Sequence, residues 1–181
     1  MTRHWCRALL VVSGLGAVLV AEVPAWSVPQ PASPVVGGVR LNSSEAALVG
    51  LVNDARRAAG LVPVVVAPGT TEVARRWSRQ LTAASTLSHN PALARQLTAS
   101  GSPRWTRVTE NVGHASACDP RQLFDAYMGS PGHRKNILDA RVRYVGVGSV
   151  VRADPASSCE AVWNTMDFVD SYTPAYGPRR M

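Results

Sequence analysis

The segment Tyr127–Leu138, which reads YMGSPGHRKNIL, places the end of one helix and the start of the next within twelve residues. Ser130 suits the N-cap, because its hydroxyl can accept a backbone N–H that has no helical partner. Pro131 suits the first helical position, where no N–H is needed. His133 then lies in the first turn, where the positive end of the helix disfavours the imidazolium form. On this segment alone, a half-exposed histidine without a function is the simpler interpretation, but a neutral imidazole can also bind a metal or accept a hydrogen bond.

Apolar periodicity predicts helices ahead of this segment. Asn42 and Glu45 form a capping box for a helix that Gly60 ends. A second helix is expected from about residue 70 to residue 84. Asn90-Pro91 starts a short third helix, and Asp119-Pro120 starts the helix that ends at Gly129.

Strands are expected mainly after the segment. Alternating apolar residues at 142–151 and 161–169 predict two strands that pair antiparallel, and the 61–66 stretch, which contains a proline, is expected to be a buried connector. Gly146 and Gly148 indicate the close approach of a neighbouring element. Helices and strands are therefore partly segregated, which favours an α+β fold over a doubly wound sheet.

Two further polar residues stand in positions that need an explanation. His89 lies in the junction between the second and third helices, where a hydrogen-bonded turn residue is the usual interpretation. Val108, Glu110 and Val112 share one face of an extended stretch, so Glu110 points inward if the valines do. A buried carboxylate needs a partner or a raised pKa. The alternative is a solvated loop glutamate.

Charge and composition limit the function classes. The 181-residue chain carries a formal charge of +7 and has one lysine, Lys135. Its basic residues are spread along the chain and form neither a clustered stripe nor a known nucleic-acid motif, so we expect no nucleic-acid partner. A weak attraction to anionic surfaces, such as wall polymers or lipid headgroups, is the more modest expectation.

The first 27 residues have the features of a secretory signal. Arg3 and Arg7 precede an apolar stretch at 8–21, and cleavage is expected after Ser27 or after Ala21. An uncleaved membrane anchor is the alternative, but the apolar stretch is shorter than the roughly 20 residues that a spanning helix needs. We therefore expect a secreted, monomeric protein without a membrane span, divided into a signal at 1–27, a flexible linker at 28–41, one domain at 42–170 and a loose tail at 171–181.

Removal of the signal leaves two cysteines, Cys118 and Cys159, which are 41 positions apart. An even pair in an exported chain predicts a disulfide. Such a bridge would stabilise the fold by about 3–4 kcal/mol in the loop-entropy treatment.

Several motifs together resemble one family. The motifs are LSH at 87–89, TENV at 109–112, SPGHRKNIL at 130–138, VGVG at 145–148 and WNT at 163–165. In this order they resemble the CAP superfamily, also called the SCP or cysteine-rich secretory, antigen 5 and pathogenesis-related 1 domain, and most of all its bacterial, YkwD-like secreted branch. The resemblance implies an α-β-α sandwich around a small antiparallel sheet, with a polar cavity.

The resemblance also implies which residues line that cavity. His89 matches the first family histidine, Glu110 the glutamate of the E-N motif and His133 the second histidine. The second family glutamate has no counterpart, since Asp125 is the nearest carboxylate and its position does not match. The supporting motif residues are Asn111, Ser130, Arg134 and Asn136.

Two functions are compatible with these residues. The family favours a secreted binding module for a lipid, sterol or wall-polymer ligand. The alternative is a metal-dependent extracellular hydrolase of the peptidase type, because two histidines and a carboxylate are the ligand set of a catalytic zinc site. We expect any zinc to bind weakly, since only three protein ligands are present. No catalytic residue can be assigned.

Overall fold

The computed structural model describes residues 35–102, 104–116, 118–154 and 157–170, and within these it leaves the side chains of 153, 154 and 157–160 undescribed. The helices are α1 (Ser43–Ala58), α2 (Pro68–Ala84), α3 (Leu93–Ala99), α4 (Pro120–Gly129) and α5 (Pro131–Ile137). The strands are β1 (Val35–Val36), β2 (Val39–Arg40), β3 (Val65–Val66), β4 (Val108–Ala115), β5 (Tyr144–Asp154) and β6 (Ser157–Val169).

The helix starts follow the capping chemistry of the sequence. The side chain of Asn42 accepts a hydrogen bond from the Glu45 N–H, and the Glu45 carboxylate accepts one from the Asn42 N–H, which confirms the capping box of α1. Asp119 accepts from the Arg121 N–H ahead of α4. By contrast, α2 begins at Pro68, two residues before the expected start, with no side-chain cap.

The four-stranded sheet has the order β3-β5-β6-β4. β5 pairs antiparallel with β6, and β6 pairs antiparallel with β4, as the alternating pattern predicted. β3 pairs parallel with β5, because Val65 and Val66 of the expected connector continue the sheet for two residues. The sheet is therefore mixed, and its antiparallel part contains the longer strands.

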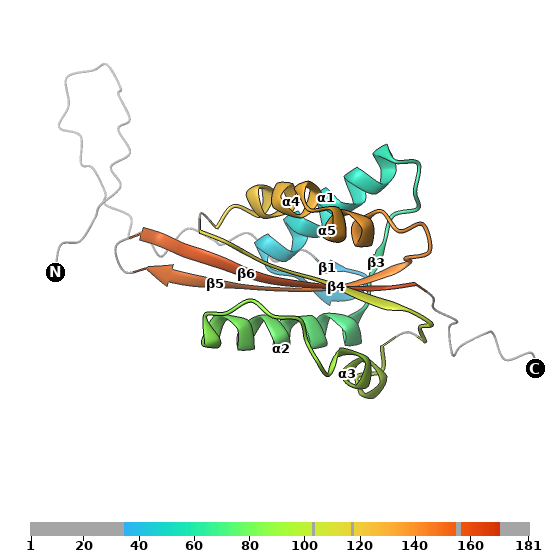
Figure 1. The fold of residues 1–181 in the computed structure, drawn as a ribbon, viewed down its shortest axis with the longest axis horizontal. Helices are drawn as coiled ribbons and strands as arrows, with labels where there is room; N and C mark the ends of the chain where they lie inside the picture. Colours follow the sequence, from blue (N-terminus) through green and yellow to red (C-terminus); the bar gives the residue numbers. More distant parts are fainter. Residues whose placement is uncertain (1–34, 103, 117, 155–156, 171–181) are drawn as a thin grey trace, which may run out of the picture. The chain divides into compact units, whose positions relative to one another are not determined.

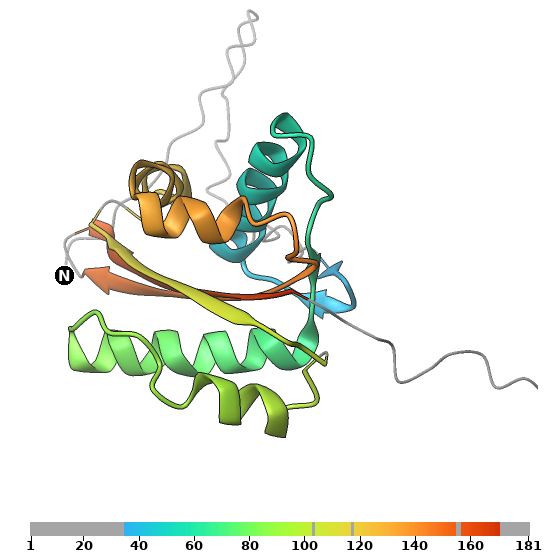
Figure 2. The ribbon, with the colours of Figure 1, turned by 45° about the vertical axis from the view of Figure 1, so that its right-hand side comes forward.

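Helices cover both faces of this sheet, as Figures 1 and 2 show. Helices α1, α4 and α5 lie on one face, and α2 and α3 lie on the other. Chains that place amphipathic helices on both faces of a sheet bury two cores, one on each side. The arrangement confirms the expected α+β fold with an α-β-α sandwich.

The two faces have separate apolar cores. On the α1/α4/α5 side, Leu48, Tyr127 and Ile137 belong to a large cluster of buried residues. On the α2/α3 side, Trp163 is buried and Trp77 is half-buried against it. Gly146 and Gly148 allow α2 to pack directly on β5, because a Cβ at either position would overlap the backbone of α2.

Seven residues that the sequence analysis assigned to the linker at 28–41 belong to the described fold. Residues 35–40 form the β1–β2 hairpin, and Leu41 is fully buried. The expected signal and tail lie outside the described residues. Cys118 precedes α4, while the side chain of Cys159 is not described, so their pairing stays a prediction. No helix within the described ranges is long and apolar enough to cross a membrane.

Candidate functional site

Helix α4 ends and helix α5 begins at one tight turn, as predicted. Ser130 is at once the C-cap of α4 and the N-cap of α5, and Pro131 is the first residue of α5. The hydroxyl of Ser130 makes no capping hydrogen bond, which corrects the expected role of this side chain. Instead, the Ser130 carbonyl accepts the Arg134 N–H and starts the helix.

Glu110 and His89 are in direct contact. The Nδ1 atom of His89 lies 2.7 Å from Oε1 of Glu110, which also accepts the Asn90 N–H at 2.9 Å. The glutamate side chain is 4% exposed and the histidine side chain 67% exposed. Glu110 therefore points inward, as the alternation of β4 predicted. A buried carboxylate orients an imidazole that remains open to solvent.

His133 approaches the same strand from the other side of the sheet. β4 is an edge strand, and adjacent residues of a strand point to opposite faces. Glu110 faces the α2/α3 side, whereas Asn111 faces α5 and donates to the His133 carbonyl at 3.1 Å. Burial lowers the pKa of His133, and the charge of His89 lowers it further. His133 is therefore neutral at physiological pH, as expected.

Asn111 and Asn136 attach α5 to β4. Asn136 donates to the Asn111 side-chain oxygen at 2.8 Å and to the Glu110 carbonyl at 3.3 Å. Asn111 is fully buried. Two of the supporting motif residues thus position the helix that carries His133. The ring of His133 also lies edge-on against Tyr127, with the ring centroids 5.1 Å apart.

Asp167 is a buried carboxylate that the sequence analysis missed. It is directly opposite Glu110 in the β4–β6 register and is fully buried. Both of its oxygens, and Oε2 of Glu110, lack a hydrogen-bond partner among the described residues. Burial raises the pKa of Asp167 well above its usual range, and the charge of Glu110 adds to the effect. The signal was present, since Trp163, Thr165, Asp167 and Val169 alternate along one inward face.

The three predicted residues do not form a metal site in this arrangement. Within the described ranges, no group of three or more histidine, cysteine, aspartate or glutamate side chains could hold a metal ion. His89 and Glu110 bind each other, and His133 comes from the opposite layer. The structure therefore joins His89 to Glu110 and places His133 on the other side of the same strand, and zinc binding by the three residues stays a prediction.

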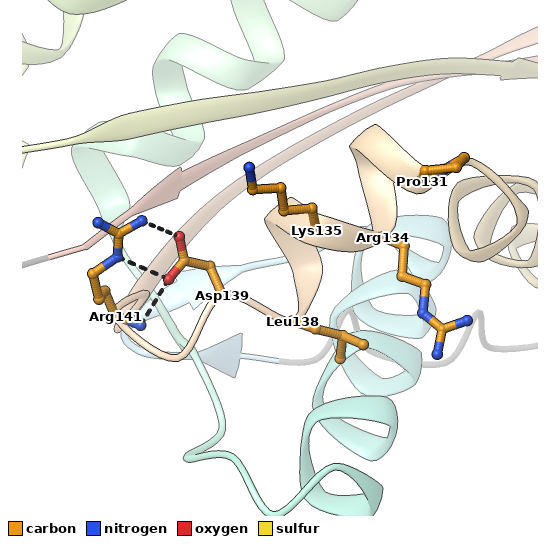
Figure 3. Close-up of a pocket in the computed structure, with 6 residues that line it drawn as sticks. All are labelled: Pro131, Arg134, Lys135, Leu138, Asp139 and Arg141. Atoms are coloured by element: carbon orange, nitrogen blue, oxygen red, sulfur yellow. Dashed lines mark hydrogen bonds and ion pairs between the residues drawn. The ribbon is translucent and has the colours of Figure 1, made fainter.

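Asp125 and Arg134 are close to His133 in the sequence but lie away from the His89–Glu110 contact. Asp125 is exposed and pairs with Arg121 on the surface of α4, which confirms that it does not replace the second glutamate of the site. Arg134 points away from His133, because it lines an open pocket of about 540 Å³ on the other face of α5 (Figure 3). Its expected supporting role at the histidine site is therefore wrong.

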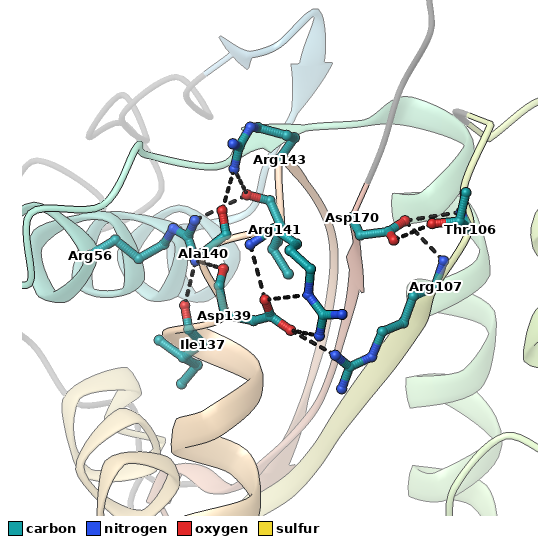
Figure 4. Close-up of polar contacts among 10 residues, drawn as sticks. Arg56, Thr106, Arg107, Ile137, Asp139, Ala140, Arg141, Arg143 and Asp170 are labelled. Atoms are coloured by element: carbon teal, nitrogen blue, oxygen red, sulfur yellow. Dashed lines mark hydrogen bonds and ion pairs between the residues drawn. The ribbon is translucent and has the colours of Figure 1, made fainter.

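Beside that pocket lies a second polar cluster, the Asp139 centre, formed by Asp139 with Arg56, Arg107 and Arg141 (Figure 4). The Asp139 carboxylate accepts hydrogen bonds from Arg107 and from the side chain and N–H of Arg141. Buried Arg56 donates to the carbonyls of Ile137, Asp139, Val142 and Val62. No sequence pattern indicated this role for Arg56, because it is one of two arginines in the last turn of α1.

The family is established by comparison with known proteins. Residues 49–166 match the family model of CAP, the cysteine-rich secretory protein family. The chain belongs to the CAP family. The resemblance of the motifs is thereby confirmed, and the His89–Glu110 pair is part of a CAP domain. In the comparison with curated proteins, no sequence matched.

Solved structures share the CAP fold. An extracellular protein with an SCP domain from Bacillus anthracis superposes with a TM-score of 0.61 at 22% identity, covering 72% of this chain and 41% of the other. A cysteine-rich secretory protein from Staphylococcus aureus gives 0.56 at 23% identity, covering 71% and 39%. An outer surface protein from Borrelia burgdorferi gives 0.57 at 13% identity, covering 73% and 96%. The chain thus spans about two fifths of the length of the first two proteins.

Proposed function

We propose that this CAP domain is a secreted binding module that acts at the cell surface or wall, and that His89 is its main recognition residue. The observation that carries the proposal is the contact between an exposed imidazole and a buried carboxylate, 2.7 Å apart. The two bacterial neighbours described as extracellular and secretory, together with the predicted signal at 1–27, support a location outside the cytoplasm.

The contact fixes the chemistry of the histidine. A carboxylate only accepts hydrogen bonds, so His89 in its neutral form donates from Nδ1 to Glu110 and presents Nε2 as an acceptor. In the described part of the chain, Nε2 has no hydrogen-bond partner. His133, which is kept neutral by burial, offers a second imidazole at the same edge of β4. The arrangement suits a ligand that carries hydroxyl groups, such as a sterol, a lipid with a polar head or a wall polymer.

The site supports binding better than hydrolysis. The hydrogen bonds of the described residues join no hydroxyl or thiol side chain to the ring of His89 or His133, so the site does not show the paired side-chain nucleophile and base of covalent catalysis. The zinc ligand set that the hydrolase alternative requires is not assembled. An oriented imidazole with an open nitrogen remains, and this is sufficient for recognition by hydrogen bonding.

Binding of the full chain to sterols, phospholipid vesicles and soluble wall fragments tests the proposal. We expect at least one of these ligands to bind to the wild type and to the His114→Gln variant, but at least tenfold more weakly to the His89→Gln variant. His114 is the matched control, because it is an exposed histidine on the same strand. Equal affinity in both variants would contradict the role of His89. Turnover of any of these ligands that depends on added zinc would instead support the hydrolase.

A further inference from the structure

The open pocket on α5 lies apart from the histidine site. Pro131, Arg134, Lys135 and Leu138 follow one another at helical spacing and form its wall with Asp139 and Arg141. His133 and Asn136 occupy the opposite face of the helix, and Asn136 contacts β4. The pocket volume of about 540 Å³ lies within the range of ligand sites, roughly 300–1,000 Å³.

The pocket carries an excess of positive charge. It is lined by three cations, Arg134, Lys135 and Arg141, and by one carboxylate, Asp139. Asp139 is 12% exposed and is already engaged by Arg141 and by the neighbouring Arg107. Arg134 and Lys135 are exposed and have no ion-pair partner among the described residues. The carboxylate thus neutralises the back of the pocket and leaves its helical wall positive.

One wall of the pocket is rigid and the other is free to adapt. Arg56 binds the carbonyls of Ile137, Asp139 and Val142, which fixes the loop that follows α5. Asp139 in turn holds Arg141 through two side-chain hydrogen bonds. The exposed side chains of Arg134 and Lys135 can adjust to a bound anion against this fixed loop.

The cations do not converge on one point. Figure 3 shows the guanidinium groups of Arg134 and Arg141 on opposite sides of Leu138. A single small anion would contact one of them, whereas a linear ligand with spaced anionic groups can contact several. Pro131 and Leu138 lie between the charges and carry none themselves, which suits a short uncharged spacer between the anionic groups. The lining residues include no aromatic side chain on which a nucleic-acid base could stack.

We propose that this pocket binds an extended polyanion in which phosphodiester groups alternate with short polyol spacers. Arginine and lysine are the usual partners of phosphate oxygens, arginine through its planar fork and lysine as a point charge. This site is separate from His89, so each can be tested without the other.

The test measures binding of poly(glycerol phosphate) to the full chain as a function of salt. The Arg134→Gln/Lys135→Gln double variant should bind about tenfold more weakly at low ionic strength, and its slope of log K against log salt should be smaller by about 1.5. The matched control is Arg76→Gln/Arg79→Gln, which removes the same charge from exposed positions of α2 in the other layer. This control should bind like the wild type.

Each other outcome overturns the proposal. Equal weakening in the two double variants would show a general effect of net charge. A wild type that does not bind the polymer would exclude the site. Binding to phosphatidylglycerol vesicles in preference to the polymer would assign the pocket to a lipid headgroup. If a thymidine oligonucleotide bound as tightly as poly(glycerol phosphate), neither the spacing of the phosphates nor the chemistry of the spacer would determine binding. Circular dichroism confirms that the exposed substitutions leave the fold intact.

Discussion

The Glu110 site and the Asp139 centre hold their poorly exposed carboxylates in opposite ways. Asp139 accepts four hydrogen bonds, three of them from arginine side chains. Glu110 has partners on one oxygen only, and Asp167 opposite it has none among the described residues. A saturated carboxylate fixes the loop around it, whereas an unsaturated one retains hydrogen-bonding capacity for a proton, a water molecule or a ligand. The comparison favours a structural role for the Asp139 centre and supports the recognition role that we propose for the Glu110 site.

The largest effect should follow from removing Arg56, which joins α1 to the loop of the Asp139 centre. Arg56→Ala leaves four carbonyls without this donor and creates a cavity, so we expect a loss of about 3–5 kcal/mol in the free energy of unfolding. Urea denaturation measures it. Arg57→Ala, at an exposed position of the same helix, is the control and should change stability by about 0.5 kcal/mol or less. A loss below about 1 kcal/mol in Arg56→Ala would show that the loop does not depend on this side chain.

Asp139→Asn should also destabilise the protein. The substitution keeps the shape of the side chain but removes the charge that holds Arg107 and Arg141 together. Both arginines can return to solvent, so the expected loss is about 1–2 kcal/mol at neutral pH and smaller in high salt. Thermal and urea unfolding at two salt concentrations measure it. If Asp139→Asn were as stable as the wild type, Asp139 would not be a structural carboxylate, and the contrast with the Glu110 site would be wrong.

Asp167→Asn should have the opposite sign and stabilise the protein at neutral pH, by about 1 kcal/mol or more. The raised pKa of Asp167 means that the folded protein keeps a proton that the unfolded chain releases. In wild type, this group therefore makes stability fall as pH rises above the ordinary aspartate value of about 4. The gain from Asp167→Asn should shrink as pH falls toward that value. Stability curves of both proteins between acidic and neutral pH decide the matter.

Asp170, three residues further on, is the matched control for that curve. Partial burial opposes its ionisation, but hydrogen bonds from Thr106 and Arg107 outweigh burial and lower the pKa of Asp170. Its contribution is present above the ordinary aspartate pKa and is lost as pH falls through the lower folded value. Asp170→Asn should therefore reduce stability at neutral pH. If both substitutions changed the free energy of unfolding at neutral pH in the same direction, the contrast between the two aspartates would be contradicted.

The smallest effect on stability is expected for His89→Gln. The side chain is mostly exposed, and Glu110 keeps the Asn90 N–H when the imidazole is lost, so the change should stay within about 1 kcal/mol. Chemical denaturation measures this change beside the ligand affinity of the same variant. A large loss of stability would make His89 a structural residue, in the manner of Asp139.

The sequence was sufficient for the five helices and the three long strands, and the family resemblance brought His89 and Glu110 into one site. Capping residues such as Asn42 and Asp119 act locally, and the alternation of Val108, Glu110 and Val112 fixes the face of a strand. These signals depend on near neighbours in the chain. They also placed Asn111 on the face opposite Glu110, which is the face that meets α5.

The sequence was not sufficient for contacts that depend on packing between distant elements. Arg56 meets carbonyls 81 to 86 positions away, and no local pattern distinguishes it from Arg57. Asp167 meets Glu110 only through the register of β4 and β6. For the same reason, the identity of three residues did not show that His133 lies on α5, in the other layer from the His89–Glu110 contact. The hairpin at 35–40 was missed because its strands have two residues each.

The most direct test of the recognition role is nitrogen-15 NMR of the imidazole rings while a solubilised cell-envelope fraction is added to the full chain. His89 should be in the tautomer with the proton on Nδ1, held by Glu110, and its Nε2 resonance should shift as ligand binds. The ring of His133 should shift less, and the exposed ring of His114 on the same strand should stay unchanged. A ring of His89 that stays unchanged while other residues report binding, or a proton on Nε2 in the free protein, would contradict the account.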